Sequence, residues 1–274
     1  MSPDRSKAAR ELLAFYAEAG VDAVIAEQPN DFLSAPEPVP AQFPAVTAST
    51  GGGAPRTADA RIVSAPARPA APPAPTPDAA VMAAREAARS AASLEELRAI
   101  LDRFEGCSLK GSASRLVFAD GTAGSRLMLV GEAPGAEEDR QGLPFVGRSG
   151  QLLDRMLKAI GLDRQQIYVA NIVPWRPPGN RTPTPVETQI CLPFIQRQIE
   201  LSNPDVLVTI GQPSTGALLG VQGITKNRGR WFPYSTGTRE IRAMPMLHPA
   251  YLLRTPLAKR HAWRDMLAIK KALS

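Results

Sequence analysis

The segment RLMLVGEAPGAEEDRQGLPFVGRSGQLLDRMLKAIG, residues 126–161, contains the two periodicities that decide the fold class. Residues 126–131 are an apolar run that ends on glycine, which is typical of a strand covered on both faces. Residues 151–161 place apolar side chains at helical spacing before a terminal glycine. The loop between them holds four acidic residues and an aromatic residue in LPFVG. The segment therefore predicts a strand, a loop and a helix.

The same alternation continues to the end of the chain. Three further apolar runs predict strands at 166–171, 205–211 and 241–247, and the predicted helices lie at 185–202, 214–220 and 256–273. Strands that alternate with helices pair in parallel. The sequence thus predicts an α/β fold, a three-layer α/β/α sandwich around a central, mainly parallel four-stranded sheet. Ligands of such sheets bind beyond the carboxyl ends of the strands, here the loops 131–146, 171–181, 211–213 and 248–254.

The N-terminal third differs in composition from the rest. Residues 1–34 are predicted to be a helical segment, with the helix over 5–27. Residues 35–78 hold 11 of the 27 prolines and few large apolar residues, which predicts a disordered Pro/Ala-rich linker. The folded domain is expected over 79–274, with a leading helix from about 78 to 103.

The formal charge of +6 is unevenly distributed over the 274 residues. Residues 224–274 contain 11 Lys and Arg against two acidic residues, a net of +9, which favours an anionic partner such as nucleic acid. The chain has no apolar run long enough to span a membrane and no apolar core of a signal peptide near its start, so a cytoplasmic location is expected. Its two cysteines cannot form a disulfide framework.

Three side chains in the predicted loops are candidates for chemistry. Phe145 is either a core residue or a stacking platform. Asn171 ends a strand, where it is either a turn-former or a reader of a pyrimidine edge. His248, one of two histidines, also ends a strand. Phosphate-binding loops of the GxGxxG and GxxxxGK[ST] types are absent from the sequence.

Two loops carry candidate contacts to nucleic acid. The proline-rich loop PWRPPGNRTPTP places Arg176 and Arg181 on a rigid segment that could face a phosphate backbone. In HPAYLLR, an apolar tip of Leu252 and Leu253 stands beside Arg254, a combination suited to wedging into a base stack. The alternatives are a surface loop and a helix-capping turn with a buried leucine.

The motifs GEAPGAEEDRQGLPFVGRSGQLLDRML, NIVPWRPPGNRTPTPVE and HPAYLLR together resemble the family 4 uracil-DNA glycosylases. The resemblance covers roughly 105–273, with the motifs in the same order. It implies hydrolysis of the N-glycosidic bond of deoxyuridine in DNA after the base is flipped into a pocket. By similarity, Phe145 stacks on uracil, Asn171 binds its Watson–Crick edge, and His248 donates toward O2. The pocket floor would be formed by Gly131, Ala133, Pro134 and Gly135.

The resemblance does not identify the acidic residue that orients the attacking water. Ala133 stands where the best-known uracil-DNA glycosylases have Asp. Glu132 and Glu138 are then the candidates to orient water or stabilise the sugar cation, with a slight preference for Glu138.

The resemblance also implies a [4Fe–4S] cluster on four cysteines, and here the chain departs from the family. Cys107 and Cys191 are kept, but Phe104 and Trp175 stand at the other two ligand positions. We therefore expect no metal site and no cofactor, with the two aromatic side chains filling the volume of the cluster.

The expected partner is uracil-containing DNA, single- or double-stranded, and the expected state is a monomer. A helix on a Pro/Ala tether could also dock a protein partner. The alternative function is non-catalytic binding of damaged or single-stranded DNA on the same fold. A small-molecule enzyme is disfavoured by the missing phosphate loop.

Overall fold

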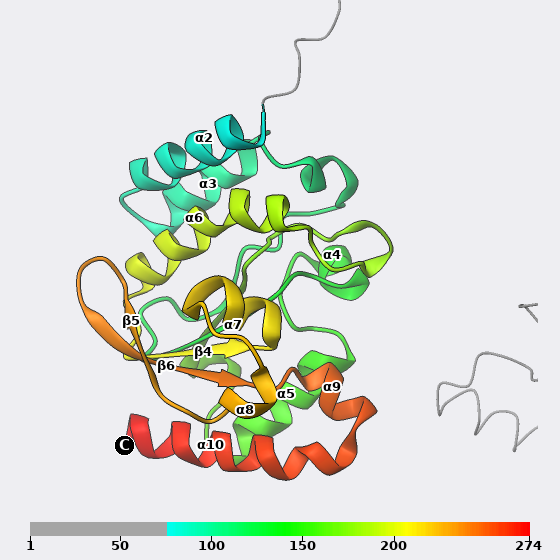
Figure 1. The fold of residues 1–274 in the computed structure, drawn as a ribbon, viewed down its shortest axis with the longest axis vertical. Coiled ribbons are helices and arrows are strands. Elements are labelled where there is room, and N and C mark those ends of the chain that lie inside the picture. The colour runs from blue at the N-terminus through cyan, green and yellow to red at the C-terminus, as the bar shows by residue number, and fades with distance from the viewer. Residues whose placement is uncertain (1–75) are drawn as a thin grey trace, which may run out of the picture. The chain divides into compact units, whose positions relative to one another are not determined.

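The computed structural model describes residues 76–274, and its centre is one six-stranded sheet (Figure 1). The strand order is β1-β3-β2-β4-β6-β5. Four strands pair in parallel: β2 (Leu127–Gly131), β3 (Ile167–Asn171), β4 (Val206–Ile210) and β6 (Glu240–Met246). Each edge carries an antiparallel strand, β1 (Asp120–Gly121) next to β3 and β5 (Phe232–Ser235) next to β6.

Helices cover both faces of this sheet (Figure 1). One face is covered by α2 (Pro77–Ser90), α3 (Leu94–Arg103), α6 (Pro185–Ser202) and α7 (Gln212–Leu219). The other is covered by α5 (Arg148–Ala159) and α10 (Lys259–Leu273). The α/β/α sandwich is thereby confirmed. Shorter helices lie in the connections: α4 (Ala136–Gln141), α8 (Ile224–Asn227), α9 (Pro249–Arg254) and the 3₁₀ turns η1 (Ser108–Ser112), η2 (Arg164–Gln166), η3 (Pro178–Asn180) and η4 (Pro256–Ala258).

Alternation along the strands divides the core into two apolar layers. Met128 and Val130 of β2 pack toward α2, α3 and α6, whereas Leu127 and Leu129 pack toward α5 and α10. All five residues of β2, of β3 and of β4 are buried. Burial on both faces explains why these strands are continuous apolar runs rather than alternating ones.

The helices and the edge strands refine the sequence-based expectations. The leading helix predicted over 78–103 is two helices, because Ser93 caps α3 by accepting a hydrogen bond from the Glu96 amide at 3.2 Å. Helix α2 begins at Pro77, so the last two residues of the predicted linker belong to it. The edge strands β1 and β5 extend the predicted four-stranded sheet. The predicted helix over 5–27 and the linker up to residue 75 lie outside the described residues. None of the helices described from residue 76 onward is long and apolar enough to cross a bilayer.

Candidate active site

The four loops that follow the parallel strands line one cavity of about 610 Å³. The strand register places the first residues of these loops at the same edge of the sheet, because Gly131 pairs with Asn171 and Ile210 pairs with Met246. The lining includes residues from each predicted loop, among them Glu132 and His248. β3 and β4 lie on opposite sides of β2, so the cavity opens where the strand order reverses, as expected for α/β sheets.

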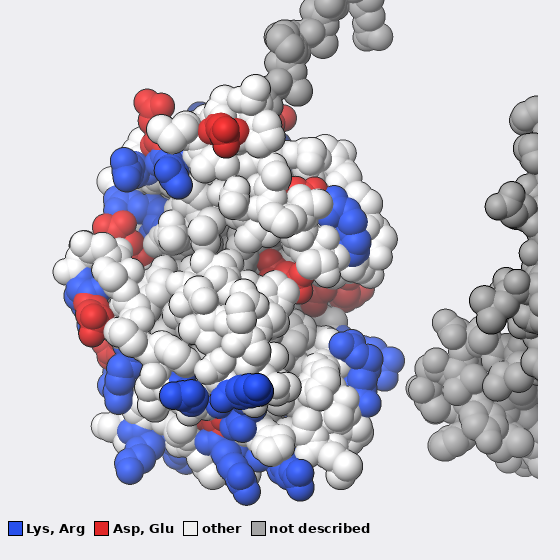
Figure 2. All heavy atoms as spheres, in the orientation of Figure 1, with Lys and Arg blue, Asp and Glu red and all other residues white. Residues whose placement is uncertain are grey.

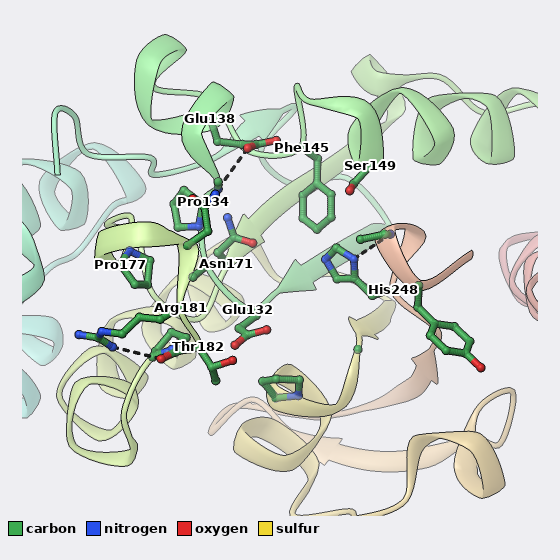
Figure 3. Close-up of a pocket in the computed structure, with 18 of the residues that line it drawn as sticks. Glu132, Pro134, Glu138, Phe145, Ser149, Asn171, Pro177, Arg181, Thr182 and His248 are labelled. Carbon is green, nitrogen blue, oxygen red and sulfur yellow. Dashed lines mark hydrogen bonds between the residues drawn. The ribbon is translucent and has the colours of Figure 1, made fainter. Parts of the chain in front are cut away.

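Phe145 forms one wall of the cavity and has an unusual backbone (Figure 3). Its ring is buried, with 5% of its surface exposed, and lies 5.7 Å from the His248 ring at an interplanar angle of 28°. Its φ of 55° lies in the left-handed region, which a residue with a bulky side chain rarely adopts. Gly131 makes room for the ring, since a Cβ there would lie 2.6 Å from Phe145 Cζ. The ring therefore belongs both to the hydrophobic core beside α5 and to the wall of the cavity.

Asn171 is buried and its amide also lies over Gly131. A side chain at Gly131 would clash with Asn171 Oδ1 as well as with the ring of Phe145. The strand end thus holds an amide, with donor and acceptor, at the cavity wall (Figure 3). The position predicted for Asn171 at the cavity is confirmed, and its role in base recognition stays a prediction.

His248 is the N-cap of α9, and its ring orientation is fixed by that position. Nδ1 accepts a hydrogen bond from the Ala250 amide at 3.1 Å, so in the neutral ring the proton is on Nε2. Burial, followed by the charge of Arg254, lowers the pKa of His248 to about 4, against which Glu138 acts in the opposite direction. At neutral pH the ring is therefore uncharged and offers an Nε2–H donor.

Glu138 has a carboxylate whose contacts are structural. It accepts hydrogen bonds from the amides of Gly135 at 3.1 Å, Val146 at 3.0 Å and Gly147 at 2.9 Å. These bonds cap α4 and tie the Phe145 loop to it. In Figure 3 the carboxylate is turned toward the Gly135 turn. Glu138 also lines the cavity, but three of its lone-pair sites already accept backbone hydrogen bonds, so the slight preference for Glu138 as the water-orienting acid stays a prediction.

Glu132 is the acid that the structure leaves unpaired. Its Oε1 is buried and has no hydrogen-bond partner among residues 76–274. The carboxylate points into the cavity, whose wall at this place includes Thr182 (Figure 3). Burial raises the pKa of Glu132 above its usual value. A desolvated anion without a partner is unfavourable unless a ligand or water meets it.

Of the three arginines predicted to contact DNA, two are hydrogen-bonded to neighbouring side chains. Arg254 lines the cavity and is exposed. Arg181 also lines it, but its guanidinium pairs with both carboxylate oxygens of Glu187 at 2.8 and 2.7 Å, and this contact lowers the pKa of Glu187 to about 2. Arg176 bonds Asn180 Oδ1 at 2.8 Å and is absent from the cavity lining.

Leu252 is wrongly placed in the predicted wedge. It is fully buried among Leu247, Ala258 and Ala262, because α9 turns that face toward α10. Leu253 is 37% exposed, which leaves it as the apolar tip. Tyr251, which sequence reasoning missed, is 36% exposed and lines the cavity.

Other lining residues were also missed, and only their loop positions could have pointed to them. Ala133, Pro134 and Gly135 line the cavity as expected. The cavity is also lined by Ser149 of α5 and by residues in or next to the predicted loops: Asn180, Thr182, Gln212 and Pro213. The Gln212 amide is engaged, since its Oε1 accepts from Ile224 at 2.8 Å.

The residues at the family's cluster position do not fit an iron–sulfur cluster. Cys107 and Cys191 are buried with their Sγ atoms 3.9 Å apart. Their contact lowers the pKa of Cys107 and raises that of Cys191. Phe104 packs edge-to-face on Phe194 at 5.0 Å, and Trp175 is buried in the same hydrophobic cluster. Within the described part of the chain, no three His, Cys, Asp or Glu side chains are grouped to hold a metal.

Surface charge is divided across the cavity (Figure 2). Lys and Arg gather over α8, α9 and α10, whereas Asp and Glu gather on the side of α4. The basic side includes Arg254, Lys259 and Arg260, all exposed. A polyanion would therefore meet positive potential on one side of the cavity and carboxylates on the other.

Comparison with known proteins agrees with this geometry. Residues 118–267 match the model of the Uracil DNA glycosylase superfamily. A type-4 uracil-DNA glycosylase of Thermotoga maritima is 43% identical over 54% of this chain and 77% of the relative. Those of Sulfurisphaera tokodaii and Saccharolobus solfataricus are each 36% identical, over 65% and 61% of this chain and 84% and 81% of the relatives. The chain therefore belongs to the uracil-DNA glycosylase superfamily and, within it, to the type-4 enzymes.

Proposed function

We propose that this chain excises uracil from DNA by hydrolysing the N-glycosidic bond, which leaves an abasic site. The observation that carries the proposal is the convergence of Phe145, Asn171 and the neutral His248 on one cavity. A base inside a duplex is out of reach, so the nucleotide has to be flipped out of the stack to enter.

Base recognition follows from two walls of the cavity. The Phe145 ring offers a flat face for stacking, and the Asn171 amide offers a donor and an acceptor to the Watson–Crick edge. Uracil presents O4 as acceptor and N3–H as donor there, whereas cytosine reverses that pattern. An amide whose donor faces O4 and whose acceptor faces N3–H therefore separates the two bases, since the wrong base leaves buried polar groups unpaired.

Bond cleavage leaves negative charge on uracil O2 and positive charge on the sugar. The Nε2–H of His248 stabilises the first, in the manner of an oxyanion hole. The ring donates this hydrogen bond as an uncharged imidazole, because its low pKa keeps it neutral. The Glu132 carboxylate faces the second charge and orients the water, in preference to Glu138, which is engaged by backbone amides. Such a base contributes about 10²–10⁴-fold.

DNA is held by the rim of the cavity and the basic side of the domain. Tyr251 and Leu253 are the exposed apolar tip that enters the vacated stack, and Arg254 meets phosphate. Because these contacts read one strand, single- and double-stranded substrates are both accepted. We also propose a monomeric enzyme in the cytoplasm, in which residues 1–34 are a dispensable extension, with a docking arm for a protein partner as the alternative.

The proposed enzyme works without an iron–sulfur cluster. Support comes from the packing of Phe104 and Trp175 at two ligand positions and from the close contact of Cys107 with Cys191. Protein purified without exposure to chelators should contain no stoichiometric iron and show no visible absorbance. About four iron ions per chain, with sulfide, would contradict this.

A strand-scission assay tests the function. A labelled oligonucleotide with one uracil is incubated with the full chain and then treated with alkali, which breaks the strand at abasic sites. Scission at the uracil alone is expected, with a matched thymine oligonucleotide as control. A gel shift without scission would favour the second candidate, a non-catalytic DNA binder, for which the divided surface charge is the supporting observation. Binding should weaken as salt rises.

A further inference from the structure

The backbone that carries Phe145 needs support from outside the cavity. Phe145 has a φ of 55°, which costs conformational energy for a residue with a Cβ. Such a conformation persists only where the surroundings determine it. The loop is short, since α4 ends at Gln141 and α5 begins at Arg148.

Arg164 of η2 supplies the first part of that support. Its Nη2 donates to the carbonyl oxygens of Pro144 at 2.6 Å and of Phe145 at 2.8 Å. The side chain is 18% exposed, and it is absent from the lining of the cavity. A guanidinium that bridges two consecutive carbonyls restrains the peptide plane between them, which a single donor cannot do.

One carboxylate accepts a hydrogen bond from the guanidinium in turn, and a second lies near it as a charge without a hydrogen bond. Arg164 Nε donates to Asp120 Oδ2 at 2.7 Å, and Asp154 Oδ1 of α5 lies 3.4 Å from Nη1. Asp120 is fixed because it belongs to the edge strand β1, opposite Val169 of β3, and its Oδ1 accepts from the Gly121 amide at 2.8 Å. The two-residue strand β1 therefore covers the sheet edge and also fixes the carboxylate that orients Arg164.

The other half of the support is Glu138. It accepts from the amides of Val146 and Gly147, directly after the two carbonyls that Arg164 binds. A cation therefore holds the carbonyls on one side of Phe145 and an anion holds the amides on the other. Gly150 completes the fit, since a Cβ there would clash with the Phe145 carbonyl.

We propose that Arg164, oriented by Asp120, is a positioning residue that holds the Phe145 ring in register with the base. It acts through Phe145 and does not touch the base. The proposal rests on the proposed excision of uracil and adds a residue that the reaction needs at a distance. A small displacement of a positioning group can lower the rate about 10²-fold.

The chain contains a matched control in Arg239. Its Nη2 also bridges two consecutive carbonyls, those of Asn203 at 2.9 Å and Pro204 at 2.7 Å, and it pairs with Asp205. Asn203 has a φ of 50°, so the supported residue is again left-handed. Arg239 is absent from the lining of the cavity.

The experiment compares R164M, R164K and R239M in the full chain. We expect kcat on a uracil oligonucleotide to fall about 10²-fold in R164M, to recover in part in R164K, and to stay at the wild-type value in R239M. The Kd for undamaged DNA should not change in any of them. The R164M effect should vanish in an F145A background, because coupled residues are not additive.

Three results would overturn the proposal: a wild-type kcat in folded R164M, an equal loss in R239M, or full additivity with F145A. If R164M does not fold, D120N serves as the milder variant, and a wild-type kcat there counts against the proposal. Hydrogen exchange at the Val146 and Gly147 amides gives a readout that needs no activity. Faster exchange in R164M supports the clamp, and unchanged exchange refutes it. A wild-type chain that leaves uracil in place refutes the proposed function instead.

Discussion

The substitution E132Q tests the assignment of the unpaired acid, because it removes the charge and keeps the shape. Glu132 points into the cavity with one buried carboxylate oxygen that lacks a partner within the described residues. If this anion orients water and faces the sugar cation, the amide cannot replace it. We expect kcat to fall by about 10²–10⁴-fold.

The pH profile adds a second expectation. His248 stays neutral above its pKa of about 4, so it does not titrate across the usual assay range. Burial raises the pKa of Glu132, and the active form is the carboxylate. Wild-type kcat/KM should therefore decline as pH falls through that raised pKa, and the residual activity of E132Q should lack this decline.

The same variant should be more stable than the wild type at neutral pH. A group whose pKa rises on folding stabilises the fold below its unfolded pKa, here 4.5, and loses that contribution as pH rises through the folded value. The E132Q side chain is still polar and without a partner, so only the cost of burying the charge is removed, and a rise in Tm is the expected sign. Each kcal/mol moves Tm by about 2–4 °C in a domain of this size. The gain should disappear below the unfolded pKa.

Single-turnover cleavage and thermal unfolding from acid to neutral pH measure both effects. E137Q is the charge-matched control, because Glu137 pairs with Arg140 at the surface and should change neither quantity. E138Q should lower Tm, since Glu138 accepts three backbone hydrogen bonds. The reasoning is refuted if E132Q keeps the wild-type rate and pH profile, or if it is less stable than the wild type.

The remaining predictions concern the pocket and its rim. N171D should shift the preference from uracil toward cytosine, measured by scission of paired oligonucleotides, because the acid lacks the amide donor. G131A should abolish cleavage while the chain stays folded by circular dichroism, since the methyl group meets Phe145 Cζ at 2.6 Å. L252A should lower the free energy of unfolding by about 2–5 kcal/mol, whereas L253A should leave it unchanged and weaken binding to uracil DNA in a gel shift.

The layered fold was predictable because its strands are unambiguous. Runs such as residues 127–131 are apolar, short and ended by glycine, which favours a strand covered on both faces over a buried helix. The edge strand β1 gave no such signal, because two residues with a glycine are too short for any periodicity. The break between α2 and α3 depends on the Ser93 cap. This cap is a weak sequence signal, because the surrounding alanine-rich segment also favours one continuous helix.

The sequence predicted which loops form the site, but not which of their side chains are buried, exposed or hydrogen-bonded. Asn171 and His248 each follow an apolar run, and parallel pairing of those runs is enough to place both at one edge of the sheet. Whether Leu252 or Leu253 faces outward depends on the rotation of a six-residue helix, and HPAYLLR allows either. Arg164 lies in an ordinary turn, so nothing in the local pattern connects it with Phe145, 19 residues earlier.

Glu132 and Glu138, two of the four acids in the GEAPGAEED segment, explain why carboxylates occur at a site that binds a polyanion. Glu138 is stabilised by three backbone amide donors, so its carboxylate has a structural role in holding the loop. Glu132 has no donor within the described residues and burial raises its pKa, so its anion is unfavourable until a sugar cation develops. An interaction that becomes favourable only in the transition state raises the rate rather than the affinity. The basic side over α8, α9 and α10 then supplies the affinity for DNA that the acids oppose (Figure 2).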